Sequence, residues 1–250
     1  MDKHRRQRPV PRMTITNDVE APGSAAFLAR MLQFGDSMFP IGAFAFSSGL
    51  ESAIQEGIVT NAATLRAYAR TALEQAARGD GIALIVAHRA ATAGDIDTLA
   101  RIDAQVYARK LSDEARTMSV RTGKKFTEMG VEMVGAPLLQ AWRECIDKSV
   151  TPGCYPIALA INFAVQELPA KQAFVVHQYG VATTILGAAL RLMKVSHIDT
   201  QKILYELTGP TAEMYEAAAT ARLSDMAGFA PLTDILAAIH TRAHVRLFMS

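Results

Sequence analysis

Histidine is one of the few residue types in this sequence whose positions could support metal chemistry. His240 and His244 stand four positions apart, so on a helix they would share one face and could bind a metal ion together. No cysteine or carboxylate beside them in the sequence completes such a site. An exposed face of a terminal helix is therefore the simpler interpretation, and we predict no metal site.

Cysteine, serine and aspartate offer the other candidate groups. Cys154 has no basic residue close to it in the sequence that would lower its pKa, which favours a structural cysteine over a reactive one. Asp36 beside Ser37 could begin an acid–hydroxyl pair, but an aspartate in this position more often caps or turns the chain. The same structural interpretation applies to Ser47 and Ser48.

The sequence lacks the familiar motifs of reaction centres. G-x-S-x-G, G-x-x-x-x-G-K-[ST], G-x-G-x-x-G and H-E-x-x-H are all absent. We therefore predict a protein that is not an enzyme, with no catalytic residue and no cofactor. Two alternatives stay open at this point: an all-α hydrolase that uses Asp36, the serine pair and scattered histidines, and a nickel-binding metallochaperone that uses Cys154, His240 and His244.

Composition narrows the class of protein further. Half of the 250 residues are apolar, which is enough for a sizeable core, and two cysteines are too few for a disulfide framework. The net charge of +2 is uneven, because residues 1–12 carry +4 and leave −2 for the rest. Residues 1–23 are predicted to be a disordered basic tail without the apolar core of a secretory signal. A body without excess positive charge argues against nucleic-acid binding.

Two uncharged stretches, 149–166 and 172–190, approach the length of a membrane span. Each contains several polar residues or prolines, whereas a spanning helix needs about 20 predominantly apolar residues. We expect both to be helices buried within the protein, and we expect a cytoplasmic protein without a membrane partner.

The pattern of apolar residues predicts a single all-α domain over residues 24–250, with roughly ten packed helices. No segment shows a sustained alternation typical of strands. Capping signals at Ser24, Thr60, Asp95 and Ser112 begin helices, and Gly79 is expected to end one. The predicted helices are 25–34, 50–56, 62–77, 81–93, 96–110, 112–134, 137–148, 157–167, 171–193, 200–207, 211–223 and 232–248.

Gly123 and Gly130 fall inside the predicted helix 112–134. Each glycine costs about 1 kcal/mol relative to alanine within a helix. Their presence predicts either close packing against another element or a kink.

Residues 34–52, FGDSMFPIGAFAFSSGLES, form the most unusual segment of the chain. It is too apolar for a solvated loop and too rich in glycine for a helix. Its aromatic residues Phe39, Phe44 and Phe46 could contact a ligand, but packing onto the helices is the favoured interpretation. The segment is therefore predicted to be a packed connector between two helices.

Three segments together resemble one family. Residues 32–51, LQFGDSMFPIGAFAFSSGLE, look like the N-terminal signature of the urease accessory protein UreF. Residues 188–193, AALRLM, followed by Gln201, are similar to the family's Ala-x-x-Arg-Leu helix and downstream glutamine. The closing residues 246–250, RLFMS, are similar to the family's C-terminus, so the matches span residues 32–250.

The sequence also departs from the family pattern at three places. Cys154 stands where a histidine usually precedes tyrosine, and Lys194, Val195 and Ser196 replace Pro-Leu-Gly. Thr241 replaces the acidic residue that commonly follows the C-terminal histidine. No role is assigned to these positions.

The resemblance implies a non-enzymatic, all-α, homodimeric assembly factor. Its expected partners are UreD (also called UreH), the GTPase UreG and apo-urease, and its expected roles are nickel insertion and regulation of UreG. The signature residues, read as structural, are Asp36, Ser37, Phe39, Pro40, Gly42, Phe44, Ser47, Gly49, Leu50 and Glu51. The residues hypothesised to bind partners are Arg191, Gln201, His240, Arg246, Leu247, Phe248 and Ser250.

Overall fold

The chain folds into packed helices, as the sequence predicts. The computed structural model describes residues 24–227, 235–236 and 247–248, and this part contains no strand. The α-helices are α1 (Ala25–Gly35), α2 (Leu50–Gln55), α3 (Ala62–Ala76), α4 (Ile82–Thr92), α5 (Ile96–Arg109), α6 (Asp113–Val134), α7 (Pro137–Asp147), α8 (Tyr155–Val165), α9 (Ala170–Leu192), α10 (His197–Thr208) and α11 (Thr211–Thr220). The short turns are η1 (Ala43–Ala45), η2 (Ala77–Gly81) and η3 (Leu223–Asp225).

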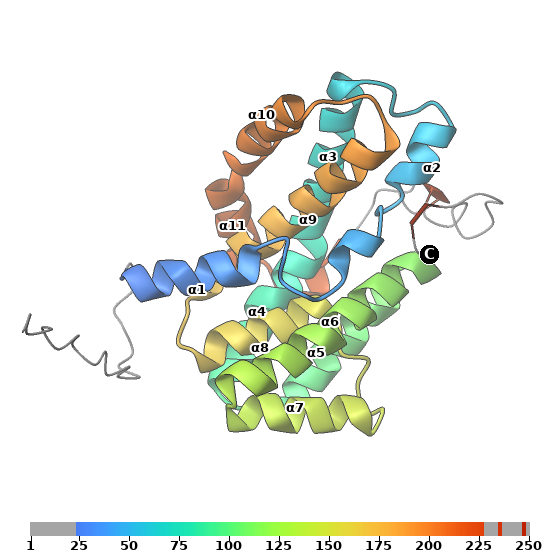
Figure 1. Ribbon diagram of the computed structural model, residues 1–250. Helices are drawn as coiled ribbons and strands as arrows, with labels where there is room; N and C mark the ends of the chain where they lie inside the picture. Colours follow the sequence, from blue (N-terminus) through green and yellow to red (C-terminus); the bar gives the residue numbers. More distant parts are fainter. Residues whose placement is uncertain (1–23, 228–234, 237–246, 249–250) are drawn as a thin grey trace, which may run out of the picture.

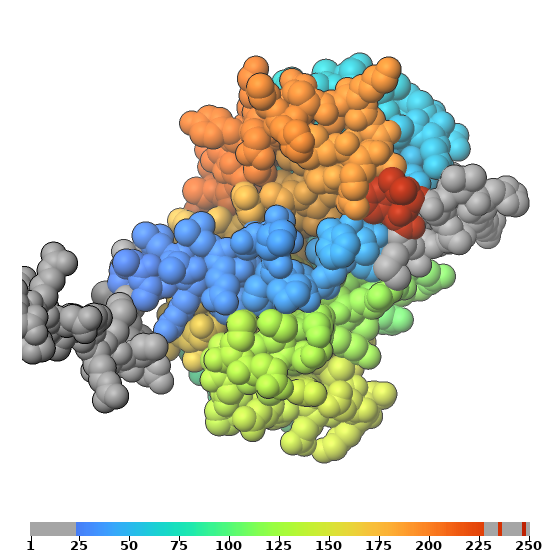
Figure 2. All heavy atoms as spheres, viewed as in Figure 1, coloured from blue at the N-terminus to red at the C-terminus, as the bar shows by residue number. Residues whose placement is uncertain are grey.

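Helix α9 joins two apolar cores. One core surrounds α8, which packs against α4 and α6, and the other lies where α9 packs against α2, α3 and α10. Figure 1 shows α9 running from the first group of helices into the second. The space-filling view in Figure 2 shows the segment that follows α1 lying across the face where the two groups meet.

The two uncharged stretches are buried helices, as predicted. Helix α8 buries all but its first and last residues, and α9 buries side chains along both halves of its length. Within the described residues α9 is the one helix whose length and apolar character would suffice to cross a membrane, yet 56% of its most apolar window is buried inside the fold. Its apolar character is thus explained by its place between the two cores.

Three of the four predicted polar caps begin helices at the expected residues. Ser24, Asp95 and Ser112 each accept a backbone N–H from the first turn of α1, α5 and α6. The prediction that Thr60 caps α3 was wrong. Asn61 caps it instead, because its side-chain oxygen accepts the N–H groups of both Ala63 and Thr64.

The prediction that Gly79 ends a helix was also wrong. The chain passes from α3 through one π-helical turn, η2, directly into α4. Gly81 is helical, and the ring of Phe174 packs so close to its backbone that a Cβ atom there would collide with the ring. The apolar run that follows then continues into the core as α4.

Several predicted boundaries shift by one to three residues, which is common where helix ends fray. Helices α8 and α10 begin earlier than predicted, and α11 ends at Thr220. Most of the predicted helix 232–248 lies outside the described residues. Ile235 and Leu236 are helical, but Leu247 and Phe248 form a bend, so the helix does not extend to 248.

Gly123 and Gly130 lie where α6 comes close to α8. Of the two explanations predicted for these glycines, close packing and a kink, the structure shows close packing. A Cβ atom on Gly123 would collide with the backbone of Gly153, Cys154 and Tyr155. A Cβ atom on Gly130 would collide with the side-chain amide of Asn162. The intrinsic cost of these glycines is therefore offset by the packing of the two helices.

Candidate functional site

The part of the signature segment that lies between α1 and α2 packs against the body through two of its three phenylalanines. Phe39 and Phe46 are buried, and the ring of Phe39 contacts those of Phe34 and Phe126 at centroid distances of 5.5 and 5.4 Å. Phe44 is different, because 67% of it is exposed. The prediction of a packed connector is confirmed for the first two rings, and Phe44 stays at the surface.

Backbone turns fix the shape of this connector. The side chain of Asp36 accepts the N–H of Met38 at 2.8 Å, so Asp36 turns the chain after α1 as predicted. Gly42 and Gly49 have φ angles of 76° and 77°, a region that favours glycine. Gly49 thereby starts α2 and places Glu51 in its first turn.

Glu51 binds the end of the chain. Its two carboxylate oxygens accept the N–H groups of Leu247 at 2.8 Å and of Phe248 at 3.2 Å. Glu51 is only 4% exposed and Phe248 only 6% exposed. Hydrogen bonds to an ionised carboxylate are the stronger kind, so this buried acid is a specific receptor for the backbone at residues 247–248.

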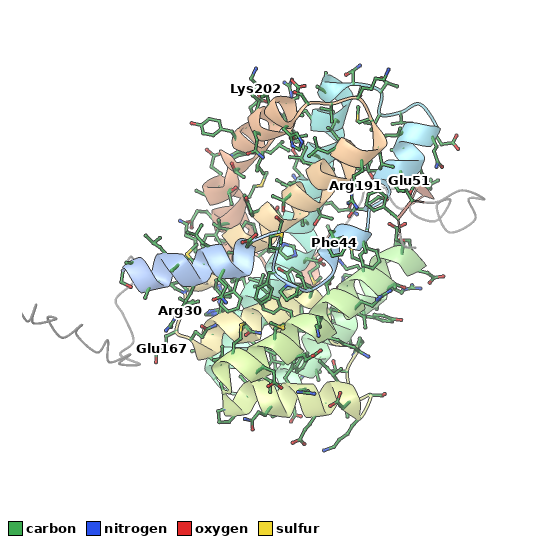
Figure 3. The ribbon with its side chains drawn as sticks, viewed as in Figure 1. Arg30, Phe44, Glu51, Glu167, Arg191 and Lys202 are labelled. Carbon is green, nitrogen blue, oxygen red and sulfur yellow. The ribbon has the colours of Figure 1, made fainter. Side chains whose placement is uncertain are left out.

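Arg191 on α9 completes the same site. Its Nη2 atom donates to the carbonyl oxygen of Phe44 at 2.8 Å, and its Nε atom donates to that of Gly187 at 3.3 Å. Its guanidinium carbon lies 4.1 Å from the centre of the Phe248 ring, a cation–π contact. Figure 3 shows Arg191, Glu51 and Phe44 gathered where α9, α2 and the connector meet. We call Glu51, Arg191 and Phe248 the tail clamp.

The chemistry of the tail clamp is that of binding. Arg191 contributes a planar cation that holds an aromatic ring and a carbonyl at once, and desolvation lowers its pKa below the ordinary value. Phe248 fills the second core beside Leu236. Leu247 is 64% exposed, so the tail clamp buries the side chain of Phe248 and leaves that of Leu247 at the surface.

Of the remaining predicted partner-binding residues, the structure describes Gln201 alone. Gln201 is exposed on α10, and Figure 3 places its neighbour Lys202 well apart from Arg191. His240, Arg246 and Ser250 lie outside the described residues, as does the His240–His244 pair. The structure therefore brings together three of the seven residues, namely Arg191, Leu247 and Phe248.

The candidate acid–hydroxyl group is not assembled. Asp36 and Ser37 are exposed, whereas Ser47 is fully buried and Ser48 lies against the sulfur of Met118. Among the described residues no group of three or more histidine, cysteine, aspartate or glutamate side chains could hold a metal ion.

Cys154 is structural, as the sequence favoured. It is fully buried at the start of α8, and its N–H donates to Asp103 at 2.8 Å. Burial raises the pKa of the Cys154 thiol, and the Asp103 carboxylate raises it further. A thiol in this state is a poor nucleophile and a poor metal ligand.

Asp103 was missed by the sequence reasoning. This fully buried carboxylate on α5 accepts the Thr151 hydroxyl at 2.5 Å and the N–H groups of Gly153 and Cys154 at 2.6 and 2.8 Å. It fixes the loop that leads into α8. An aspartate on the apolar face of a helix is the one sequence signal that could have indicated it.

A cavity of about 350 Å³ was also missed. Lys110 pairs with Asp80 at 2.5 Å on its wall, and the Nε2 atom of His177 lies 3.8 Å from the same carboxylate. Burial alone would raise the pKa of Asp80, but Lys110 and His177 together hold it below its ordinary value. Burial lowers the pKa of His177 to about 4, so its imidazole is neutral at pH 7.

The fold and the tail clamp define a class: a protein whose described part is all-helical and in which buried side chains hold residues 247–248 against the body. Comparison with known proteins agrees with this class. The sequence model of the UreF family matches residues 59–208. The chain belongs to the UreF family.

Its relatives match along nearly their whole length. The chain is 52% identical over 237 residues to "Urease accessory protein UreF 2" of Brucella canis, covering 95% of this chain and 98% of the relative. It is 51% identical to "Urease accessory protein UreF 1" of Brucella melitensis over the same shares. It is 48% identical over 225 residues to "Urease accessory protein UreF" of Yersinia pestis, covering 90% of this chain and 99% of the relative.

Proposed function

We propose that this chain is a urease accessory protein of the cytoplasm that bridges UreD (UreH) and the GTPase UreG to apo-urease. In this role it acts as a chaperone without enzymatic activity of its own, and it modulates UreG during GTP-dependent nickel insertion. Membership of the UreF family and the names of the relatives support the accessory role.

The tail clamp is the observation that carries the proposal. Three side chains from distant parts of the sequence, Glu51, Arg191 and Phe248, cooperate to hold the end of the chain. Leu247 remains exposed beside them. An exposed apolar side chain on an anchored backbone costs little entropy when a partner binds it. We expect Leu247, with Arg246 next to it, to contact UreD.

Deletion of residues 240–250 tests this contact. The deletion should abolish co-purification with UreD, while the helical circular dichroism spectrum stays that of the intact chain. Leu247→Asp is the sharper variant, because it changes an exposed side chain and leaves Phe248 seated. Unchanged co-purification of both variants with UreD would contradict the tail contact.

Reconstitution tests the function as a whole. Purified UreD, UreG, apo-urease, nickel and GTP should yield active urease with this chain present and far less without it. The rate of GTP hydrolysis by UreG, measured in the same mixture, shows whether this chain modulates the GTPase. Activation that is equal with and without the chain would refute the proposed role.

A homodimer is part of the proposal. Ile198 and Tyr205 are 68% and 85% exposed on α10, on the face that also carries Gln201. Exposed apolar side chains at this helical spacing are typical of protein contacts. Tyr205→Asp should reduce the mass measured by light scattering from that of a dimer to that of a monomer.

Arg191 was a candidate contact for the dimer or for UreG. Its bonds to Phe44 and Phe248 favour the alternative, a role within the chain. Arg191→Ala distinguishes the two roles. A variant that only loses stability supports the internal role, and a folded variant of normal stability that no longer binds UreG supports the interface.

The two alternative functions have less support. The buried thiol of Cys154 does not suit a nickel carrier that would use it with His240 and His244. For the hydrolase, Asp36 and the serine pair are not assembled into one site. Nickel binding in stoichiometric amount, lost on substitution of Cys154, would revive the carrier.

A further inference from the structure

We propose that the groove between the connector and helices α6 and α7 binds an acidic segment of a partner protein, with an apolar side chain of that segment resting on Phe44. We call this surface, lined by residues 40–46 of the connector and by side chains of α6 and α7, the basic groove. The inference rests on the proposed function, in which the chain works by binding other proteins.

The connector supplies the apolar side of the basic groove. Pro40, Ile41, Phe44 and Ala45 line it, and Ile146 of α7 lies on the opposite side. Phe44 is 67% exposed, so its ring is accessible to a partner. Aromatic side chains in this position commonly serve as anchors of protein interfaces.

The position of Phe44 is fixed rather than loose. Arg191 donates to its carbonyl oxygen at 2.8 Å, and the preceding Gly42 turns the chain with a φ angle of 76°. Phe46, two residues on, is buried in the core. The ring is therefore presented on a backbone held at both ends, so a partner that binds it gives up little conformational entropy.

The opposite wall is positively charged. Arg121, Lys124 and Lys125 follow one another at helical spacing on α6, and Arg143 projects from α7. Among the described residues that line the groove, four cations face two carboxylates, Glu128 and Asp147.

Part of this positive charge has no ion-pair partner in the part of the chain that the structure describes. Lys125 pairs with Glu128 at 2.8 Å, and Arg143 lies 3.6 Å from Glu132 and 3.8 Å from Asp147. Lys124 is exposed and forms no ion pair with any residue in the described part of the chain. The groove thus keeps a net positive charge beside an apolar floor, which is complementary to carboxylates that flank a leucine, isoleucine or phenylalanine.

A protein segment fits this groove better than a nucleic acid does. Glu128 and Asp147 would repel a row of phosphates, and binding of a nucleic-acid backbone depends on many unopposed cations. The groove presents one exposed ring rather than a row of aromatic side chains on which bases stack. A short acidic segment satisfies both the charged wall and the apolar floor.

Charge reversal tests the proposal. The double variant Lys124→Glu/Arg143→Glu reverses the charge of two side chains that line the groove, and Lys194→Glu is a control that reverses one charge outside it. Phe44→Ser is the second variant and removes the apolar anchor. All three should retain the wild-type circular dichroism spectrum, which is measured first.

The binding partners used are purified UreD, UreG and apo-urease, each tested separately by titration. The double variant should weaken the binding of at least one of them roughly tenfold or more, with a shallower dependence on salt, while Lys194→Glu binds as the wild type does. Phe44→Ser should weaken binding of the same partner. Overlapping peptides from that partner should then bind the wild type only where carboxylates flank an apolar residue.

Three outcomes separate the possible failures. If the wild type binds its partners and activates urease but both groove variants do so equally well, the inference is wrong and the proposed function stands. A labelled single-stranded oligonucleotide is tested in the same way. If it binds the wild type but not the double variant, while both bind the partner proteins equally, the groove binds nucleic acid and the inference is wrong. If the wild type binds none of the three proteins, the proposed function itself fails.

Discussion

The carboxylate of Glu51 accepts the backbone N–H of Phe248, 197 residues further along the chain, at 3.2 Å. This bond joins the signature segment near the N-terminus to the closing residues. The ring of Phe248 is simultaneously held by Arg191 of α9. Three segments that the resemblance marks separately are therefore parts of one structural unit.

Phe248→Ala should release the end of the chain. The change removes a buried ring and its contact with Arg191, so we expect the free energy of unfolding to fall by about 1–3 kcal/mol. Leu247→Ala is the matched control, because that side chain is 64% exposed and its loss should cost less than about 0.5 kcal/mol. Urea unfolding measures both. Equal effects of the two variants would show that the tail clamp does not hold.

Asp103→Asn should destabilise the protein strongly. In asparagine an NH2 group replaces one of the two carboxylate oxygens that accept the N–H groups of Gly153 and Cys154. At least one buried donor would then lose its acceptor, at a cost of about 2–4 kcal/mol in the free energy of unfolding. Such a loss corresponds to a decrease in melting temperature of roughly 5–15 °C. Asp97→Asn, on the exposed first turn of the same helix, should change the melting temperature little. Differential scanning calorimetry measures the melting temperatures of both variants, and equal values would contradict the role of Asp103.

Glycines within two long helices should respond oppositely to alanine. Gly123→Ala places a Cβ atom against the backbone of residues 153–155 and should cost about 2 kcal/mol or more. Gly180→Ala on α9 meets no atom within 4 Å, so the better helix propensity should stabilise the protein by up to about 1 kcal/mol. Chemical denaturation measures both changes. A stabilised Gly123→Ala would contradict the close contact of α6 and α8.

Acid should weaken the fold through His177. Burial lowers the pKa of this residue to about 4, so between pH 6.5 and 4 the unfolded chain binds a proton that the folded chain does not. The free energy of unfolding should therefore fall as the pH decreases through this window, by roughly 3 kcal/mol from this residue. In His177→Gln the decrease should be correspondingly smaller. Urea unfolding at pH 7 and at pH 4 measures both proteins, and equal decreases in the two would contradict the role of His177.

Local patterns predicted most of the helices. The caps at Ser24, Asp95 and Ser112 and the apolar periodicity are interactions between residues near one another in sequence. Ser196, one of the residues that differ from the family pattern, also acts locally. Its side chain and that of Asp199 form a capping box that starts α10. Such signals can be recognised from a short stretch of sequence alone.

Distant contacts could not be predicted from the same patterns. Asp103 bonds to residues about fifty positions away, and Glu51 bonds to the other end of the chain. A single sequence shows which carboxylates are unusual but not which backbone groups they meet. The resemblance to a family identified Arg191, Leu247 and Phe248 as candidates, and the fold then showed that Glu51 binds the same tail.

The turn η2 sets the rotational register between α3 and α4. If the same residues 77–81 formed a regular α-helix instead of this wider turn, every later side chain of α4 would rotate by about 100° about the helix axis. Leu84 and Ile85 would then leave the core, and Asp80 would no longer face Lys110. The wider turn thus keeps α3 and α4 in their packed orientations although the chain between them holds one residue more than a regular α-helix would take up.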